Sequence, residues 1–216
     1  TCALPISWTT LGISILTHQT QLNPLMSPRP FHVNTAEALG YLSDLASNIY
    51  PGRGLVIGMT PDAKFLAQIV WIMGRSPNSR NRVYRTDPEI PGRLYTDWAH
   101  LGSAGDPSLV IYNAMLENQE HGKYVVSNGH QTDTVLASMA KLGIGGFIPG
   151  HADWRYEPDE PNFTPRITGA ISLGSGSWRA DFSVLSREPG GGCRSEYFYV
   201  GDIQPGYGSC LTTYTG

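Results

Sequence analysis

Long apolar runs, lysine and paired cysteines are scarce in this sequence of 216 residues. No run of about 18 apolar residues occurs, so the sequence predicts no membrane-spanning helix. The three cysteines form no C-x-x-C pair, which disfavours a disulfide scaffold or a cysteine-rich zinc site and leaves reduced thiols or a single Cys193–Cys210 bridge. Charged residues make up only 15% and the net charge is −3, which disfavours a general binder of nucleic acids or acidic membranes.

Glycine and proline are abundant instead, with 25 and 16 copies, and this composition predicts a globular domain of many short strands and turns. Arginine supplies twelve of the 15 basic residues. Four of the arginines, Arg75, Arg80, Arg82 and Arg85, share one short stretch that contains no Asp or Glu. Such concentrated guanidinium charge in a nearly neutral chain indicates a local anion site.

Apolar periodicity predicts two helices, at 35–48 and 131–142, and several antiparallel strands. The apolar runs 54–59 and 65–73 are joined by a short turn and predict a hairpin. Further strands are expected at 109–116, 123–127, 167–173, 178–186 and 195–200. Many strands with few helices between them indicate an α+β or all-β fold rather than a doubly wound parallel sheet.

The common motifs for phosphate, nucleophile and metal chemistry are missing. The sequence contains no G-x-x-x-x-G-K-[ST], no G-x-S-x-G and no H-E-x-x-H. Gly52, Gly54 and Gly58 precede an apolar strand instead of opening a helix, so they do not form a dinucleotide fingerprint. His151 and Asp153 have no further ligand at a suitable spacing, so we expect no metal site.

Two polar clusters at strand ends offer cationic donors. The first, YPGRG at 50–54, places Arg53 between two glycines, although a solvated arginine in an ordinary turn has the same pattern. The second, GRSPNSRNRVY at 74–84, combines guanidinium, hydroxyl and amide donors that suit a phosphate group, with a solvated loop as the competing interpretation. Its candidate ligands are Arg75, Ser76, Asn78, Arg80, Asn81 and Arg82.

Three further clusters carry polar side chains next to apolar segments. YNAMLE offers Tyr112, Asn113 and Glu117 as site residues. Tyr112 and Asn113 point to opposite faces of a strand, so only one of them can face a given cavity. The competing interpretation is that Tyr112 is buried in the core. SNGHQTD combines a tight turn with the start of a helix. The helix N-terminus can bind an anion, and the competing interpretation is an ordinary helix cap. EPDEPNFTPRI is stiffened by three prolines. The candidates from the last two clusters are Asn128, Gly129, Gln131, Thr132, Asn162, Thr164 and Arg166.

In this order, the five clusters resemble the motifs of the archaeal-type IMP cyclohydrolase family and its bacterial relatives, and PGYGSCLTTYTG at 205–216 resembles the C-terminal signature of that family. The resemblance runs from about residue 33 to the last residue, whereas 143–156 departs from the helical segment expected there. We therefore expect a single domain over 33–216 and an N-terminal extension over 1–32.

The resemblance implies a fold, a reaction and a setting. The fold would be a four-layer αββα sandwich similar to N-terminal-nucleophile hydrolases, without self-cleavage. The reaction would close 5-formamidoimidazole-4-carboxamide ribonucleotide to inosine monophosphate with loss of water. The resemblance implies a purine ribonucleotide as the binding partner, no metal or cofactor, no nucleic acid or membrane partner, and a cytoplasmic location. Symmetric self-association is the default expectation.

The resemblance also suggests roles for the candidates. Arg53 or Tyr112 would donate to the formyl oxygen, Asn113, Asn128 or Gln131 would orient the carboxamide, and Glu117 would be the general acid or base. The phosphate ligands would come from Arg75, Arg80, Arg82 and Arg166, of which at least one is expected to be structural.

Three alternatives remain open at this point. A nucleotide-binding protein without turnover would carry the same motifs. An N-terminal-nucleophile amidohydrolase would use Thr1 or Cys2, but a proline-rich segment follows these residues where a core strand is required. A carbohydrate- or protein-binding β-domain would explain the strands but not the arginine- and asparagine-rich loop at 74–84.

Overall fold

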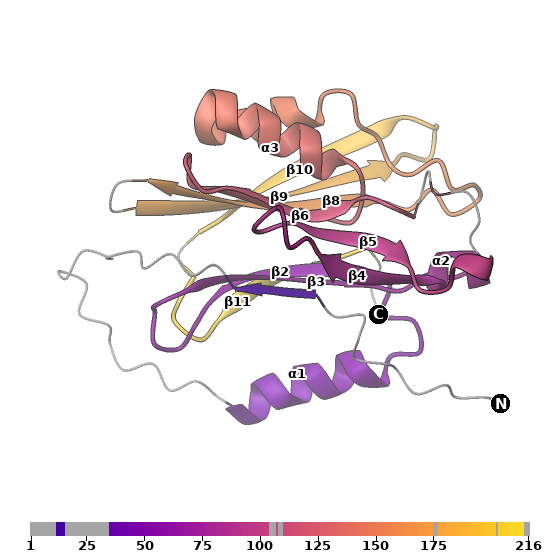
Figure 1. Cartoon of the computed structure of the whole chain (residues 1–216), viewed down its shortest axis with the longest axis horizontal. Helices are drawn as coiled ribbons and strands as arrows, with labels where there is room; N and C mark the ends of the chain where they lie inside the picture. The colour runs from indigo at the N-terminus through magenta and orange to yellow at the C-terminus, as the bar shows by residue number, and fades with distance from the viewer. Residues whose placement is uncertain are drawn as a thin grey trace.

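Two antiparallel sheets lie face to face in the computed structural model of the chain (Figure 1). The structure describes residues 12–15, 35–103, 107, 110–174, 177–201 and 203–213. The observed fold is α+β, as expected from the many strands and few helices.

The smaller sheet has four strands. Its order is β1 (Gly12–Ile15), β3 (Leu66–Ile72), β2 (Arg53–Met59) and β11 (Gly208–Thr212). The β2–β3 pairing confirms the predicted hairpin. Strand β1 lies within the segment 1–32, most of which is outside the described residues, so the proposed domain boundary stays a prediction.

The larger sheet has seven strands. Its order is β10 (Cys193–Val200), β9 (Ser177–Arg187), β8 (Arg166–Gly174), β7 (Lys123–Ser127), β6 (Asn113–Asn118), β5 (Leu94–Trp98) and β4 (Arg82–Thr86). The strand predicted at 109–116 is observed at Asn113–Asn118. Strands β4 and β5 were not predicted, because RVYRT and LYTDW are short and mix apolar with charged residues.

Helices lie on the two outer sides of the paired sheets. Helix α3 (Gln131–Leu142) covers the outer face of the seven-stranded sheet, and α1 (Thr35–Ser47) lies beyond the four-stranded sheet (Figure 1). Both helices confirm their predictions. Two residues of the expected apolar stripe are exposed: Leu39, in α1, is 60% exposed, and Ile49, just after α1 ends, is 92% exposed. A 3.6-residue period identifies a helix but does not say what covers its apolar face.

Shorter helices connect these elements. Helix α2 (Pro77–Arg80) lies inside the segment that was expected to be a loop, because a Ser76–Ser79 capping box and a proline in the first turn favour a helical start. The 3₁₀ helices η2 (Leu101–Ser103), η4 (Gly143–Gly146) and η5 (Pro149–His151) complete the set. Among the described residues, no helix is long and apolar enough to cross a membrane.

The main hydrophobic core lies between the sheets. It includes Leu55 and Ile57 from β2 and Ile167 and Ile171 from β8, none of which is exposed. A second cluster lies under α3 and includes Val135 and Met139. Cys193 and Cys210 are both free thiols.

His151 fastens the α3 side to the seven-stranded sheet. Its Nδ1 lies 2.7 Å from the Phe147 carbonyl oxygen and must therefore carry the proton. Its Nε2 then accepts from the Thr168 and Ser183 hydroxyls, at 3.0 and 2.9 Å. Burial lowers the pKa of His151 from 6.5 to about 4, so the folded protein holds the ring neutral.

This burial predicts a pH-dependent stability. Above pH 6.5 the imidazole is neutral in both states, whereas between pH 6.5 and 4 the unfolded chain binds a proton that the folded chain does not. The free energy of unfolding should therefore fall by roughly 3 kcal/mol across this window. Urea denaturation at several pH values measures the effect, and His151→Gln should flatten the profile. Equal pH slopes for both proteins would exclude His151 as the cause.

Candidate functional site

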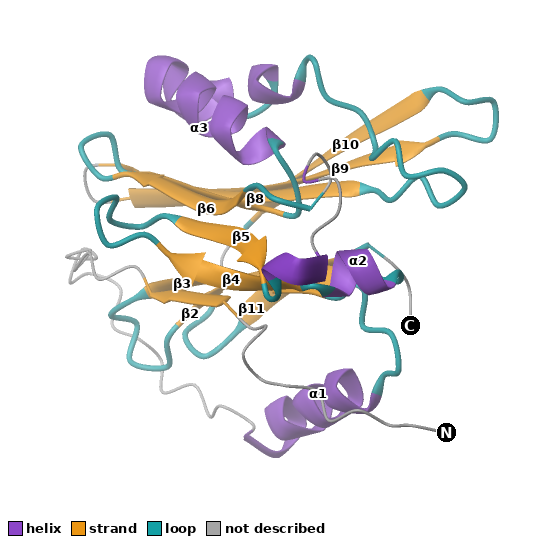
Figure 2. Cartoon of the chain, turned by 45° about the vertical axis from the view of Figure 1, so that its right-hand side comes forward, coloured by secondary structure: helices purple, strands orange, loops and turns teal. Residues whose placement is uncertain are grey.

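Three buried arginines meet at one end of the sandwich, between the two sheets. Arg53, Arg82 and Arg166 are the first residues of β2, β4 and β8, and they are only 7%, 3% and 5% exposed. Helix α2 leads into β4 at this end, which lies on the right in Figure 1 and faces the viewer in Figure 2. Three guanidinium groups buried so closely together require negative charge nearby.

Glu157 supplies part of that negative charge. Its side chain is 2% exposed, and its Oε1 lies 2.6 Å from Nη1 of Arg53 and 3.7 Å from Nη1 of Arg166. The other carboxylate oxygen, Oε2, has no hydrogen-bond partner among the described residues. One carboxylate against three guanidinium groups leaves the cluster with a net charge of two positive units, which favours an anionic or strongly electronegative ligand.

Several buried polar atoms of the cluster point to such a ligand. All three guanidinium nitrogens of Arg82 lack a partner within the described part of the chain, as do Nε of Arg166 and the Tyr112 hydroxyl. Each unsatisfied buried polar group costs about 1–3 kcal/mol, and charged groups cost more. Buried polar groups in folded proteins are normally paired, so this concentration of unpaired donors marks a candidate binding site.

The electrostatics of the cluster show how closely the groups lie. Burial lowers the pKa of Arg82 and of Arg166, and the positive charge of Arg53 lowers both further. Burial would lower the pKa of Arg53 as well, but the Glu157 carboxylate and other neighbours raise it overall. Burial raises the pKa of Tyr112, so its hydroxyl stays protonated and can donate a hydrogen bond.

The turn at 127–132 contacts two of the buried arginines, Arg53 and Arg166. Asn128 donates to the Pro165 carbonyl at 2.9 Å and accepts from the Ile167 amide at 2.9 Å. Gln131 accepts from Nη1 of Arg166 at 3.1 Å. The predicted substrate ligands Asn128 and Gln131 therefore hold the start of β8 and orient Arg166.

Gly129 and Thr132 fix the same turn. A Cβ on Gly129 would lie 2.2 Å from Nη1 of Arg166, so a side chain at this position would displace the guanidinium. The Thr132 hydroxyl lies 2.6 Å from the Ser127 hydroxyl and is fully buried. These contacts give both residues a structural part in the site.

The α2 segment carries a second, exposed set of donors. The side chains of Arg75 and Arg80 are exposed, and Nε of Arg80 donates to the Gly74 carbonyl at 2.8 Å. Ser76 caps the helix by accepting from the Ser79 amide at 3.1 Å. The two arginines thus remain near solvent at the end of the molecule where the buried arginines lie.

Two asparagines of this segment differ in their surroundings. Asn81 is buried and joins two loops, donating to the His100 carbonyl and accepting from the His100 amide, both at 2.8 Å. Asn78 has a buried side-chain oxygen without a partner among the described residues. Asn81 therefore supports the fold, whereas Asn78 leaves an acceptor unused.

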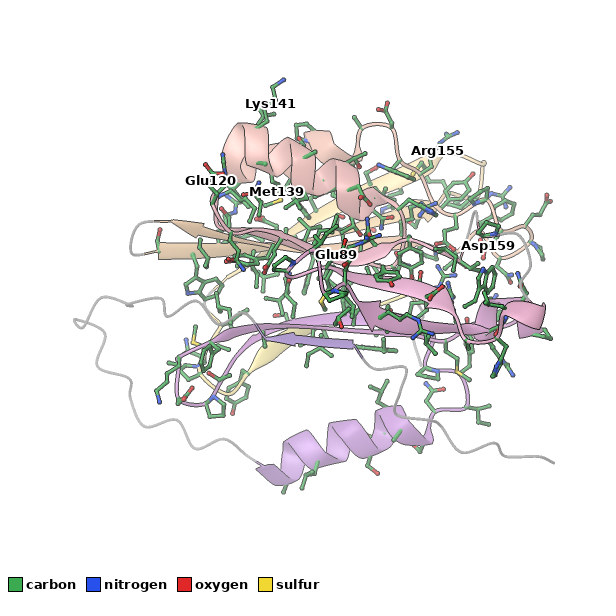
Figure 3. The ribbon with its side chains drawn as sticks, in the orientation of Figure 1. Glu89, Glu120, Met139, Lys141, Arg155 and Asp159 are labelled. Atoms are coloured by element: carbon green, nitrogen blue, oxygen red, sulfur yellow. The ribbon has the colours of Figure 1, made fainter. Side chains whose placement is uncertain are left out.

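The proline-rich segment 157–165 connects α2 to the buried cluster. Asn162 accepts a hydrogen bond from Arg75, and Asp159 accepts from both the amide and the hydroxyl of Thr164. Figure 3 shows Asp159 and Arg155 at the same end of the molecule as α2. The predicted ligands Asn162 and Thr164 thus lie in the segment that presents Glu157.

Asn113 and Glu117 do not join the buried cluster. The Asn113 amide group contacts Arg93 and Asp133, at 2.8 Å each. Glu117 accepts from Gln119 in the β6–β7 hairpin. This hairpin lies at the opposite end of the molecule, where Figure 3 labels Glu120. Glu117 is therefore poorly placed to act with Tyr112, and its predicted catalytic role gains no support from its position.

Two residues of this region that carry buried polar atoms were missed from the sequence. Glu157 lies in an acidic, proline-rich stretch, where carboxylates are usually solvated, and Tyr84 lies in a strand that was not predicted. The closeness of Glu157 to the TPRI segment, which carries Arg166, was the available signal. Thr1 and Cys2, the nucleophiles of one alternative function, lie outside the described residues.

Comparison with known proteins gives one match. A family model described as IMP cyclohydrolase-like protein matches residues 50–216. No curated protein and no solved structure matches the chain significantly. The matched range includes Arg53, Arg82, Tyr112, Glu157 and Arg166, so the buried cluster lies entirely within it.

Proposed function

We propose, from the premise that this chain belongs to the IMP cyclohydrolase-like protein family, that it closes the six-membered ring of inosine monophosphate. The substrate would be 5-formamidoimidazole-4-carboxamide ribonucleotide, and the second product would be water. The observation that carries the proposal is the buried cluster of unpaired donors, Arg82 and Tyr112, beside the half-paired Glu157 carboxylate.

The chemistry needs a base and an oxyanion site. The carboxamide nitrogen attacks the formyl carbon of the same molecule, forming a C–N bond while the formyl oxygen gains negative charge. One proton leaves the attacking nitrogen, and the formyl oxygen then departs as water with that proton and the proton of the formamido nitrogen. Both reacting groups belong to one substrate, so positioning alone supplies several kcal/mol of the barrier reduction.

The cluster offers a group for each task. Arg82 and Tyr112 donate to the formyl oxygen and stabilise its developing charge. Glu157 accepts the proton of the carboxamide nitrogen through its unpaired Oε2 and returns it to the leaving oxygen. Arg53 holds the carboxylate in place through its 2.6 Å contact with Oε1.

The exposed arginines suit the phosphate. The side chains of Arg75 and Arg80 are exposed beside α2, where a phosphate can keep part of its hydration while it accepts charge-assisted hydrogen bonds from guanidinium groups. We therefore assign the phosphate to the α2 segment and the reacting end of the nucleotide to the buried cluster. Asn78 and Asn162 are the neighbouring polar candidates.

We also propose that the layered architecture is the four-layer αββα sandwich similar to N-terminal-nucleophile hydrolases, without self-cleavage. The stacking of α3, the two sheets and α1 supports this assignment (Figure 1).

An absorbance assay of ring closure tests the function. Purified protein should convert the formamido nucleotide to inosine monophosphate, and calorimetry should show binding of the product. Binding without turnover would identify a nucleotide-binding protein, and neither activity nor binding would refute the proposal.

The phosphate assignment predicts a selective loss of affinity. Arg80→Ala should weaken binding of inosine monophosphate about tenfold, because one charge-assisted contact is worth about 1.5 kcal/mol, and should change kcat less than about threefold. Arg194→Ala, in an exposed ion pair on β10, is the matched control and should leave affinity unchanged. Unchanged affinity in Arg80→Ala would remove this residue from the phosphate site.

A further inference from the structure

A second buried phenol lies beside the candidate site. Tyr84 follows Arg82 by two residues on β4, so the two side chains project from the same face of the strand. The Tyr84 hydroxyl is buried and, like that of Tyr112, has no hydrogen-bond partner among the described residues. Tyr84 therefore extends the polar cluster of Arg82 and Tyr112 by one residue.

The backbone holds the two tyrosines on either side of one threonine. Tyr84 is paired with Thr96 in the β4–β5 ladder. The Thr96 amide donates to the Tyr112 carbonyl at 2.9 Å, and the Tyr112 amide donates to the Thr96 hydroxyl at 2.9 Å. Thr96 is fully buried, so its hydrogen bonds fix the backbone of β4 and of Tyr112 relative to one another.

The electrostatics agree with a close pair. Burial raises the pKa of Tyr84 well above 10, and the neighbouring Tyr112 phenol raises it further, while Arg82 lowers it. Phenylalanine would fill the same space without an unsatisfied hydroxyl, which costs about 1–3 kcal/mol. The two phenols therefore lie close enough to interact, but they do not form a well-aligned hydrogen bond in this structure.

We propose that Tyr84 is a positioning residue that acts through Tyr112. Once the substrate is bound, the Tyr84 hydroxyl donates to the Tyr112 oxygen, and the proton of Tyr112 is then directed at the formyl oxygen. Hydrogen bonds of catalytic groups are often poorly aligned before the substrate binds and tighten in the complex. This inference rests on the proposed ring closure and adds a residue to it.

The charged and titratable groups that face the phenol pair come from five parts of the chain. Their combined charge favours the ionised form of Tyr112, and a hydrogen bond from Tyr84 favours it further. They are Arg82 on β4, Arg53 on β2, Arg166 on β8, Glu157 in the segment 157–165, and His130, whose ring centroid lies 5.8 Å from that of Tyr112.

Steady-state kinetics of Tyr84→Phe, Tyr112→Phe and the double variant test the proposal. Tyr84→Phe should lower kcat about tenfold with KM changed less than about twofold. Because Tyr84 acts through Tyr112, adding Tyr84→Phe to Tyr112→Phe should cause no further loss. Tyr197→Phe, a partly buried tyrosine on the α3 side of the sheet, is the matched control and should retain full kcat.

The pH profile separates positioning from a purely structural effect. Tyr112 must be protonated to donate, so kcat falls at alkaline pH as this phenol ionises. Loss of the hydrogen bond from Tyr84 should move this alkaline limb upward by about 0.5 pH unit, because the ionised phenol loses a donor. A structural role would leave the limb in place.

The outcomes are distinct. Additive losses in the double variant, an unmoved alkaline limb or full activity in Tyr84→Phe would overturn the inference while ring closure by the wild type stands. A wild-type protein that does not close the ring would remove the proposed function and this inference together.

Discussion

Replacing Glu157 by glutamine is expected to lower kcat for ring closure by about 10³-fold, within the range that a positioned general base contributes. The amide keeps an oxygen for Arg53 but cannot accept the proton of the carboxamide nitrogen. Binding of inosine monophosphate should persist or strengthen, because one negative charge leaves a cluster that holds three guanidinium groups. Turnover assays and calorimetry measure the two effects separately.

The control for this substitution lies in the same segment. Glu160→Gln also removes a carboxylate between 157 and 165, but its side chain is exposed and should not affect kcat. Circular dichroism must show that Glu157→Gln is folded, because the change weakens the balance of charge around Arg53 and Arg166. A folded Glu157→Gln protein with wild-type kcat would exclude Glu157 as the base.

Replacing Arg82 by methionine is expected to have opposite effects on activity and stability. Arg82 is only 3% exposed, and none of its guanidinium nitrogens has a partner among the described residues. Exchanging a buried, unpaired charge for an apolar side chain of similar length should raise the free energy of unfolding by about 2 kcal/mol. The same exchange should lower kcat/KM at least about 10²-fold, because one oxyanion donor is lost.

Urea denaturation without ligand and steady-state kinetics measure this pair of effects. Arg85→Met is the matched control on β4, since Arg85 is exposed and forms a surface ion pair with Asp97 at 2.7 Å. It should change stability by less than about 1 kcal/mol and leave activity intact. A destabilised Arg82→Met protein would mean that the guanidinium supports the fold, which contradicts its assignment as a ligand-binding group.

Stability and function are thus separated in space. His151, also deeply buried, has both ring nitrogens satisfied and fastens α3 to the sheet. Arg82 and Tyr112 lie between the sheets with their polar atoms unsatisfied. A buried polar group with full hydrogen bonding contributes to a specific fold, whereas an unsatisfied one is stable only with a ligand or at a cost to the fold.

Local sequence patterns determined much of the secondary structure. The two apolar runs of 54–73 and the turn between them specify the β2–β3 hairpin, and the spacing of Leu136 and Met139 specifies α3, because both depend on neighbours within a few residues. Strand β4 gave no such pattern. Its RVYRT residues are stabilised by pairing with β5 and by the adjacent core, which are tertiary contacts.

For the site, the sequence by itself determined which groups are available. Arg53, Arg82, Tyr112 and Arg166 were identified from their motifs, since each lies next to a predicted strand or in a donor-rich stretch. The sequence could not tell which arginines are buried and which are exposed. Arg80 and Arg82 are only two residues apart, yet Arg80 is exposed and Arg82 is buried.

Only the tertiary structure decided the partners. Burial of Glu157 against Arg53, more than a hundred residues away in the chain, follows from the stacking of two sheets, and no local pattern encodes it. Glu117 lies instead beside the β6–β7 hairpin, away from the buried cluster, although its motif follows Tyr112 directly in the sequence. Desolvation and long-range charge pairing act through space, so they are fixed by packing and not by sequence spacing.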